Sequence, residues 1–205
     1  MAVKAGRYRG QSAQERIAAR REQLVAAALE VWGRTDGPPV TMTRICAEAG
    51  LTERYFYEQF ANLDEALLAV LAGITEEIRT VVDAAINDTE GGPAERVRAA
   101  VAAFVAVITD DPRKGRVAIL LGASRPTLAA PRNAMLRGFG AYAASEAAAL
   151  YGSDALQGRD GELAGLMFIG GLEKLVGAWL DGSITAGPDD IVDAATRAFE
   201  RLGHA

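Results

Sequence analysis

Apolar residues recur every three or four positions along almost the whole of this 205-residue chain. That spacing places them on one face of an α-helix, whereas half-buried strands would show strict alternation, which no segment shows. The pattern therefore predicts an all-α protein of about nine helices. The expected helices cover residues 12–34, 41–49, 52–60, 62–86, 94–109, 115–123, 128–151, 162–180 and 189–202.

Glycine, proline and short polar residues mark where these helices should end. The clearest linker is residues 87–93, and the other breaks are residues 36–39, 110–112, 158–161 and 181–188. We therefore expect three parts: an N-terminal arm and head (1–62), a connector helix (63–86) and a C-terminal body (87–205).

The segment Thr41–Phe60 carries the most specific pattern in the chain. Thr41 can cap a short helix by accepting a hydrogen bond from a free backbone N–H, and Gly50 stands where that helix would end in a left-handed residue. Thr52 then begins a second helix. Two short helices joined by a glycine-containing turn indicate a helix–turn–helix, which places its second helix in the major groove of DNA.

This segment resembles the DNA-binding domain of the TetR-family transcription regulators, and with residues 62–68 the resemblance covers about a third of the chain. The sequence departs from the family at Leu63, where members often carry Lys, and at Arg54 and Tyr55, where many carry Gly and a small residue. The resemblance implies a three-helix DNA-binding head followed by a helical body that binds a small effector and dimerises. The matching residues are Thr41, Ile45, Ala49, Gly50, Leu51, Thr52, Phe56, Tyr57 and Phe60.

The candidate DNA contacts lie at the start of each short helix. Arg54 is the best candidate for reading guanine, because a guanidinium matches two acceptors on that base, although it could simply be solvated. Tyr55 could contact a thymine methyl group or a phosphate, and Tyr57 aligns with the family's phosphate-contacting tyrosine. Glu53 could accept from a cytosine amine, but a first-turn acid that favours the helix dipole is the commoner role. The full set is Arg7, Arg9, Thr41, Thr43, Arg44, Thr52, Glu53, Arg54, Tyr55 and Tyr57.

The charge of the chain is unevenly distributed. The net charge is −5, yet residues 1–21 contain six basic residues and one acidic residue. A basic arm, with Arg7 and Arg9 in it, would attract phosphate while the acidic body repels it. The alternative is that this arm is an ordinary solvated tail.

Large adaptable side chains in the body are candidates to line an effector cavity, although each could equally be a core residue. Charges are few in the helix interiors, with Arg137, Glu146 and Glu173 the main exceptions, so the expected effector is hydrophobic or aromatic. The candidate pocket residues are Phe104, Met135, Phe139, Tyr142, Met167, Phe168 and Trp179.

Small residues concentrate in the last two expected helices. Glycine costs about 1 kcal/mol in a helix interior, so several in one helix, Gly165 among them, indicate close packing against another helix, unless the helix is kinked. Two such helices from each subunit would form a four-helix dimer interface. The candidate interface residues are Gly170, Gly171, Gly177, Ile191, Ala194, Ala195 and Ala198.

The sequence shows no catalytic constellation. Its one histidine is His204, its one cysteine is Cys46, and it has neither a glycine-rich phosphate loop nor clustered metal ligands. It also lacks an uninterrupted run of 18 apolar residues and a signal-peptide core. We therefore expect no enzyme, no cofactor, no metal, no membrane segment and a cytoplasmic location.

Together these patterns and the family resemblance predict a ligand-responsive regulator that binds a palindromic operator in double-stranded DNA as a homodimer. The favoured form is a repressor released by a small, largely hydrophobic effector. An activator stays possible, as does a protein of this fold that acts mainly by protein–protein interaction or ligand sequestration. Leu63 and the acidic residues Glu53 and Glu58 motivate that last alternative.

Overall fold

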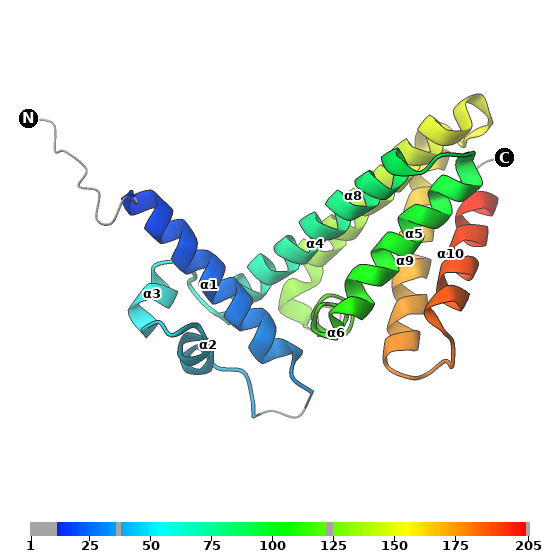
Figure 1. Ribbon diagram of the computed structural model, residues 1–205. Coiled ribbons are helices and arrows are strands. Elements are labelled where there is room, and N and C mark those ends of the chain that lie inside the picture. Colours follow the sequence, from blue (N-terminus) through cyan, green and yellow to red (C-terminus); the bar gives the residue numbers. More distant parts are fainter. Residues whose placement is uncertain (1–11, 36–37, 122–124, 204–205) are drawn as a thin grey trace, which may run out of the picture. The chain divides into compact units, whose positions relative to one another are not determined.

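The computed structural model describes residues 12–35, 38–121 and 125–203 (Figure 1). Over these ranges the chain forms nine α-helices, two 3₁₀ turns and one π-helical segment, and no strand. The predicted all-α fold is confirmed. The chain divides into two compact units, Met1–Gly73 and Ile74–Ala205, and helix α4 contributes residues to both.

The first unit is built on α1 (Ala13–Gly33), which begins with a capping box between Ser12 and Glu15. Its buried face consists of the five residues that the sequence pattern selects, Leu24, Ala27, Ala28, Val31 and Trp32. Helix α1 contacts α2 (Met42–Ala49), and α2 contacts α3 (Glu53–Tyr57). Ile45 and Cys46 of α2, Phe56 of α3, Phe60, and Ala66, Leu67, Val70 and Leu71 of α4 (Leu63–Asp88) are buried as well.

The turn between α2 and α3 forms as expected. The Thr41 hydroxyl accepts from the Arg44 N–H at 3.3 Å, and Gly50 is left-handed at φ 65°. The N–H groups of Gly50 and Leu51 then bond back to the carbonyls of Ala47 and Cys46, which satisfies the free end of α2. The second helix is shorter than predicted: α3 ends at Tyr57, and the Thr52 side chain makes no capping bond.

Helix α4 begins at the predicted cap. The Asn62 side chain accepts from the Glu65 N–H at 2.9 Å, and Glu65 accepts from the Ala61 N–H at 2.7 Å. The helix continues to Asp88, two residues beyond the expected end, so the connection to the next helix is only residues 89–92.

The second unit surrounds a core of aliphatic and aromatic side chains from α5, α8, α9 and α10. Its elements are α5 (Pro93–Asp110), α6 (Pro112–Gly115), η1 (Arg116–Leu121), η2 (Pro126–Leu128), α8 (Ala129–Tyr151), η3 (Gly152–Asp154), α9 (Gly158–Leu180) and α10 (Pro188–Gly203).

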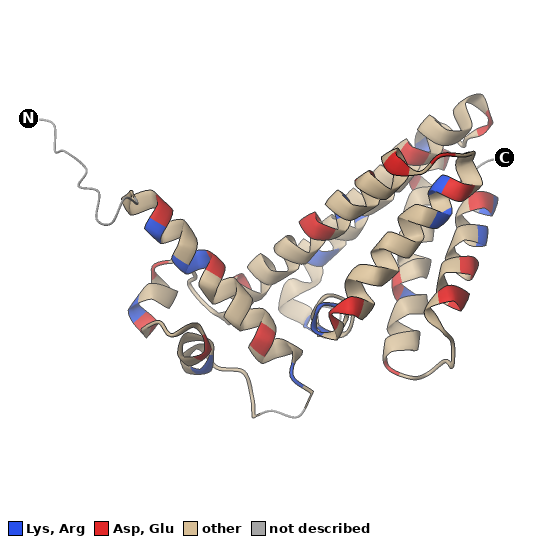
Figure 2. Cartoon of the chain, viewed as in Figure 1, with Lys and Arg blue, Asp and Glu red and all other residues tan. Residues whose placement is uncertain are grey.

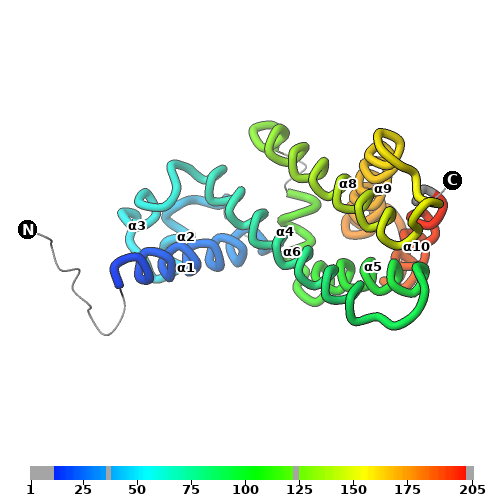
Figure 3. Tube along the Cα trace, turned by 90° about the horizontal axis from the view of Figure 1, so that it is seen from above, coloured from blue at the N-terminus to red at the C-terminus, as the bar shows by residue number. Residues whose placement is uncertain are grey.

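Helices α8 and α9 lie side by side (Figure 3) and touch through their backbones. A Cβ atom added to Gly165 would stand 2.1 Å from the Gly140 carbonyl oxygen, so no side chain fits there. We expected a break between helices at residues 158–161, but α9 already begins at Gly158. Gly161 is buried in the first turns of that helix, against the Leu156 carbonyl. The sequence shows the glycines but not the neighbour that requires them.

Helix α9 is long and apolar enough on average to cross a membrane, by length and composition alone. The expectation of no such segment overlooked it because Glu173 and Lys174 interrupt its apolar run. Core helices of soluble proteins that are mostly buried pass the same test; 17% of this stretch of α9 is buried, and its buried face packs into the body core.

Candidate nucleic-acid interface and effector region

The α3 helix has one buried face and one exposed face. Phe56 is 1% exposed and packs against Phe60 with ring centroids 5.4 Å apart, which fixes the helix to the core of the first unit. Tyr57 is 62% exposed, and Thr52, Glu53 and Arg54 are also exposed. The turn therefore presents a hydroxyl, a carboxylate, a guanidinium and a phenol to solvent from one short segment.

The Arg54 side chain is 84% exposed, and its Nε lies 3.1 Å from Glu58 one turn later. An exposed pair at this spacing is worth about 0.3–0.5 kcal/mol, so a base or a phosphate could displace Glu58. The geometry leaves Arg54 available for a guanine edge.

Three other candidate contacts are engaged within the protein. The Thr43 hydroxyl donates to the Glu53 carboxylate at 2.7 Å and so links the first turns of α2 and α3. Arg44 donates to the carbonyls of Pro38 and Pro39, at 3.1 Å for Pro39, and holds the loop that precedes α2. Sequence reasoning treated these side chains singly and could not see the pairing.

Two arginines of α1 reach the α3 region, and the sequence reading named neither as a site residue. The Arg20 guanidinium lies 4.6 Å from the centre of the Tyr55 ring, which is half-buried. Arg21 lies 4.6 Å from the Phe60 ring and donates to the Gln59 carbonyl at 3.3 Å. Arg20 and Arg21 follow Arg16 by four and five residues, and this clustering of arginines on one helix was the feature of the sequence that could have identified them.

Basic side chains of the first unit lie on α1, α2 and α3 as well as at Arg34 (Figure 2). Arg34 is paired with Glu30 and Glu48, whereas Arg54 is paired with Glu58, the residue directly after α3. The candidate arm residues Arg7 and Arg9 lie outside the described residues.

The candidate pocket residues are dispersed through the second unit. Phe104 and Trp179 pack against its core, and the Trp179 Nε1 donates to the Ala186 carbonyl at 2.8 Å. Met135 and Tyr142 meet α4, where Thr75 donates to the Met135 sulfur and Tyr142 donates to Asp83. Phe139 is half-buried, and Met167, 65% exposed on α9, does not line an interior.

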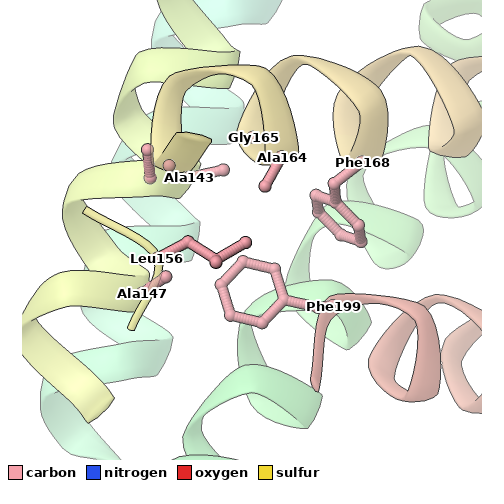
Figure 4. Close-up of a pocket in the computed structure, with 9 residues that line it drawn as sticks. Ala143, Ala147, Leu156, Ala164, Gly165, Phe168 and Phe199 are labelled. Atoms are coloured by element: carbon pink, nitrogen blue, oxygen red, sulfur yellow. The ribbon is translucent and has the colours of Figure 1, made fainter. Parts of the chain in front are cut away.

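A small hollow lies among α8, α9 and α10 (Figure 4). The Phe168 and Phe199 rings, with centroids 5.0 Å apart, close one side, and Phe168 is the one pocket candidate that lines it. The hollow holds no more than about one water molecule. The remaining lining residues are Ala143, Ala144, Ala147, Leu156, Gly161, Ala164 and Gly165.

A polar group of side chains lies where α4 meets α8. The Tyr142 hydroxyl donates to Asp83 at 2.5 Å, and burial together with this carboxylate raises the pKa of Tyr142. Burial, and next the charge of Asp83, also raises the pKa of Glu146, while Arg96 opposes that shift. Elsewhere in the unit Glu173 forms a half-buried ion pair with Arg132, whereas Arg137 is exposed.

The candidate interface residues fall into two groups. Gly170, Gly171 and Ala198 are exposed, and a Cβ atom on either glycine would meet nothing within 4 Å. Ile191 and Ala195, in contrast, are 1% and 3% exposed in the core of the subunit, so they can only support an interface from beneath. Gly177 and Ala194 are half-buried. The apolar residues that α9 does expose, Leu163, Leu166 and Met167, were not selected as interface residues.

Comparisons with known proteins show what this chain is similar to. No family model matches the chain. The HTH-type transcriptional regulator BetI of Brucella anthropi is 32% identical over 83 residues, which cover 40% of this chain and 42% of that regulator. The chain thus aligns with less than half of the length of its curated relative.

Solved structures match over nearly the whole length. A TetR-like transcriptional regulator from Rhodococcus sp. RHA1 has a TM-score of 0.64 at 18% identity, covering 90% of this chain and 95% of that one. FadR of Bacillus subtilis, solved in complex with stearoyl-CoA, has a TM-score of 0.69 at 20% identity and covers 89% and 97%. The chain therefore has the all-α fold of the TetR-family transcription regulators, with its helix–turn–helix at the N-terminal end.

Proposed function

We propose that this protein is a ligand-responsive transcription regulator that binds a palindromic DNA operator as a homodimer. The observation that carries the proposal is the geometry of α3, in which Phe56 is buried while Arg54 and Tyr57, and Thr52 at the N-cap, are exposed. Arg54 would read a guanine edge, and Tyr57 would contact a phosphate. The match to BetI, a regulator of the same class by name, supports this assignment.

The dimer would form through α9 and the adjacent α10, two helices from each subunit. The exposed face of α9 carries Leu163, Leu166 and Met167, and the exposed Gly170 and Gly171 allow a second helix to approach closely. Two heads on one dimer would double the number of base pairs read, and a two-fold axis requires a palindromic site.

The effector would be a small, largely hydrophobic molecule that enters the body and releases the protein from DNA, as in a repressor. The stearoyl-CoA complex of FadR supports a hydrophobic ligand for this fold. Helix α4 would carry the response, because its residues as far as Gly73 belong to the first unit while Thr75 and Asp83 bond to α8. The effector can shift DNA affinity only as far as it prefers the released state.

A selection from a random pool of duplexes, followed by binding titrations at several salt concentrations, tests the proposal. Wild-type protein should enrich a palindromic sequence and lose affinity steeply with salt. Arg54→Ala should relax the preference at one base position, and Tyr57→Phe should weaken binding to all duplexes about equally. Arg159→Ala removes an exposed arginine from the body and should change neither property.

Failure to enrich any sequence would overturn the proposal. A shallow dependence on salt would favour the alternative of ligand sequestration or protein–protein interaction, because few phosphates would then be neutralised. The Arg54–Glu58 pair is the feature that keeps this alternative open, since it partly neutralises the exposed arginine.

A further inference from the structure

The first turn of α3 has one backbone bond of its own, from the Tyr55 N–H to the Thr52 carbonyl at 2.9 Å. The helix has five residues, and Thr52 at its N-cap makes no side-chain capping bond. So short a helix has almost no stability of its own in water. The orientation of Arg54 must therefore depend on contacts that other elements make with the first turn of α3.

Beside the burial of Phe56, two side-chain contacts reach this turn in the described part of the chain, one from each preceding helix. From α2, the Thr43 hydroxyl donates to Glu53 at 2.7 Å. From α1, the Arg20 guanidinium stacks at 4.6 Å from the centre of the Tyr55 ring. The two contacts reach the residues immediately before and after Arg54, so together they fix the segment from which that side chain projects.

We propose that Thr43, Glu53, Arg20 and Tyr55 are positioning residues that set sequence selectivity by holding Arg54, and that they do not themselves read DNA. This rests on the proposed DNA-binding function. The physical reason is that the Thr43 hydroxyl has a single proton, which it already donates to Glu53, and that Arg20 lies over the Tyr55 ring. Donation from Thr43 to a phosphate would require its bond to Glu53 to break first.

A double-mutant cycle on Thr43 and Glu53 tests the first pair, with the duplex selected by wild-type protein and a scrambled duplex as probes. Thr43→Val and Glu53→Ala should each lower affinity for the selected duplex about threefold to tenfold, the range expected for one hydrogen bond. The double variant should lose no more than either single variant, because both remove the same contact. Thr43→Ser keeps the hydroxyl and should bind like wild type.

The scrambled duplex separates this role from direct contact. A positioning pair leaves affinity for the scrambled duplex and the slope against salt unchanged. If Thr43→Val weakens binding to both duplexes equally, Thr43 is a phosphate contact and the proposal is wrong. If Glu53→Ala changes which base is preferred, and the two losses add, Glu53 reads a base and the proposal is also wrong.

The second pair is tested in the same way. Tyr55→Phe keeps the ring under Arg20 and should bind the selected duplex like wild type, whereas Tyr55→Leu should lose selectivity. Arg20→Met should lose selectivity with an unchanged slope against salt. A slope that falls by about 0.9 would instead identify Arg20 as a phosphate contact.

Hydrogen exchange in the free protein keeps failure of this inference distinct from failure of the proposed function. Thr43→Val and Tyr55→Leu should speed exchange at the backbone amides of residues 55–60 while the amides of α1 keep their protection. This result would support the bracing of α3 even if no duplex were enriched. Unchanged exchange at residues 55–60 would overturn it, whatever the DNA result.

Discussion

The turn at Gly50 and the crossing of α8 with α9 both depend on glycine, but for different physical reasons. At Gly50 the backbone is left-handed at φ 65°, and a Cβ atom would meet nothing within 4 Å. At Gly165 the backbone is helical, and a Cβ atom would stand 2.1 Å from the Gly140 carbonyl oxygen. The first glycine is needed for its conformation and the second for its size.

This difference explains why one glycine is interpretable from sequence and the other is not. A helix end is local, so an apolar helix, a glycine and then Leu51 and Thr52 suffice to identify it. A helix crossing joins residues 25 positions apart, and nothing near Gly165 in the sequence indicates Gly140 as its neighbour. The sequence pattern therefore predicted that Gly165 packs against a second subunit, whereas it packs against α8 of its own subunit.

The largest effect should come from placing a methyl group in the crossing. Gly165→Ala would force two backbones apart, and we expect a loss of about 3 kcal/mol or more in the free energy of unfolding. Gly171→Ala on the same helix meets nothing within 4 Å and should stabilise the isolated subunit by about 0.5–1 kcal/mol through helix propensity. Urea denaturation at low protein concentration measures both, and equal effects would show that the crossing is not close.

A second prediction contrasts the two faces of α9. The face with Gly165 is locked on α8, whereas Met167, two residues on, is 65% exposed. If that face joins two subunits, Met167→Glu places two carboxylates at one two-fold interface and should weaken the dimer by about 2–3 kcal/mol, or roughly 30- to 150-fold in Kd.

Sedimentation velocity across a range of concentrations measures this dissociation. Ala102→Glu introduces the same charge at an exposed position of α5 and should leave the dimer intact. A dimer that tolerates Met167→Glu as well as Ala102→Glu would place the interface elsewhere, and Leu163 and Leu166 would then need another explanation.

The candidate site, like the two glycines, has local features that the sequence predicts and contacts between distant residues that it does not. The caps at Thr41 and Asn62 and the five buried residues of α1 follow from local spacing, and each was predictable. The Thr43–Glu53 bond and the stacking of Arg20 on Tyr55 join residues 10 and 35 positions apart, which local patterns do not connect. Burial of Ile191 and Ala195 likewise depends on which face of α10 meets α5.

A third, smaller effect tests the conformational role of Gly50. Gly50→Ala should cost about 1–2 kcal/mol, because alanine is strained in the left-handed region. Gly50→Asn should cost less, since asparagine tolerates that region, whereas Gly165→Asn should be at least as damaging as Gly165→Ala. Unfolding curves of the four variants measure this. A Gly50→Asn variant as unstable as Gly50→Ala would mean that the turn depends on space after all.

The smallest effect concerns Glu146, which lies on α8 as Gly140 does but close to Asp83 of α4. Burial and the Asp83 charge raise the pKa of Glu146 above its ordinary value of 4.5, despite the nearby Arg96. The folded state thus holds this proton more tightly than the unfolded state, so its stabilising contribution is present at low pH and is lost as pH rises through the raised pKa. Glu146→Gln should therefore be more stable than wild type at pH 7, and the advantage should shrink towards pH 4.

Asp111→Asn is the opposite case, because bonds from Arg113 lower the pKa of Asp111. That variant keeps a capping side chain, should be less stable than wild type at pH 7, and should match it at low pH. Thermal melts measure the two trends, from pH 4 to pH 8 for Glu146→Gln and from pH 7 down to about pH 2 for Asp111→Asn, whose carboxyl has its pKa lowered from 3.8. A Glu146→Gln advantage that does not shrink towards pH 4 would show that burial does not govern Glu146.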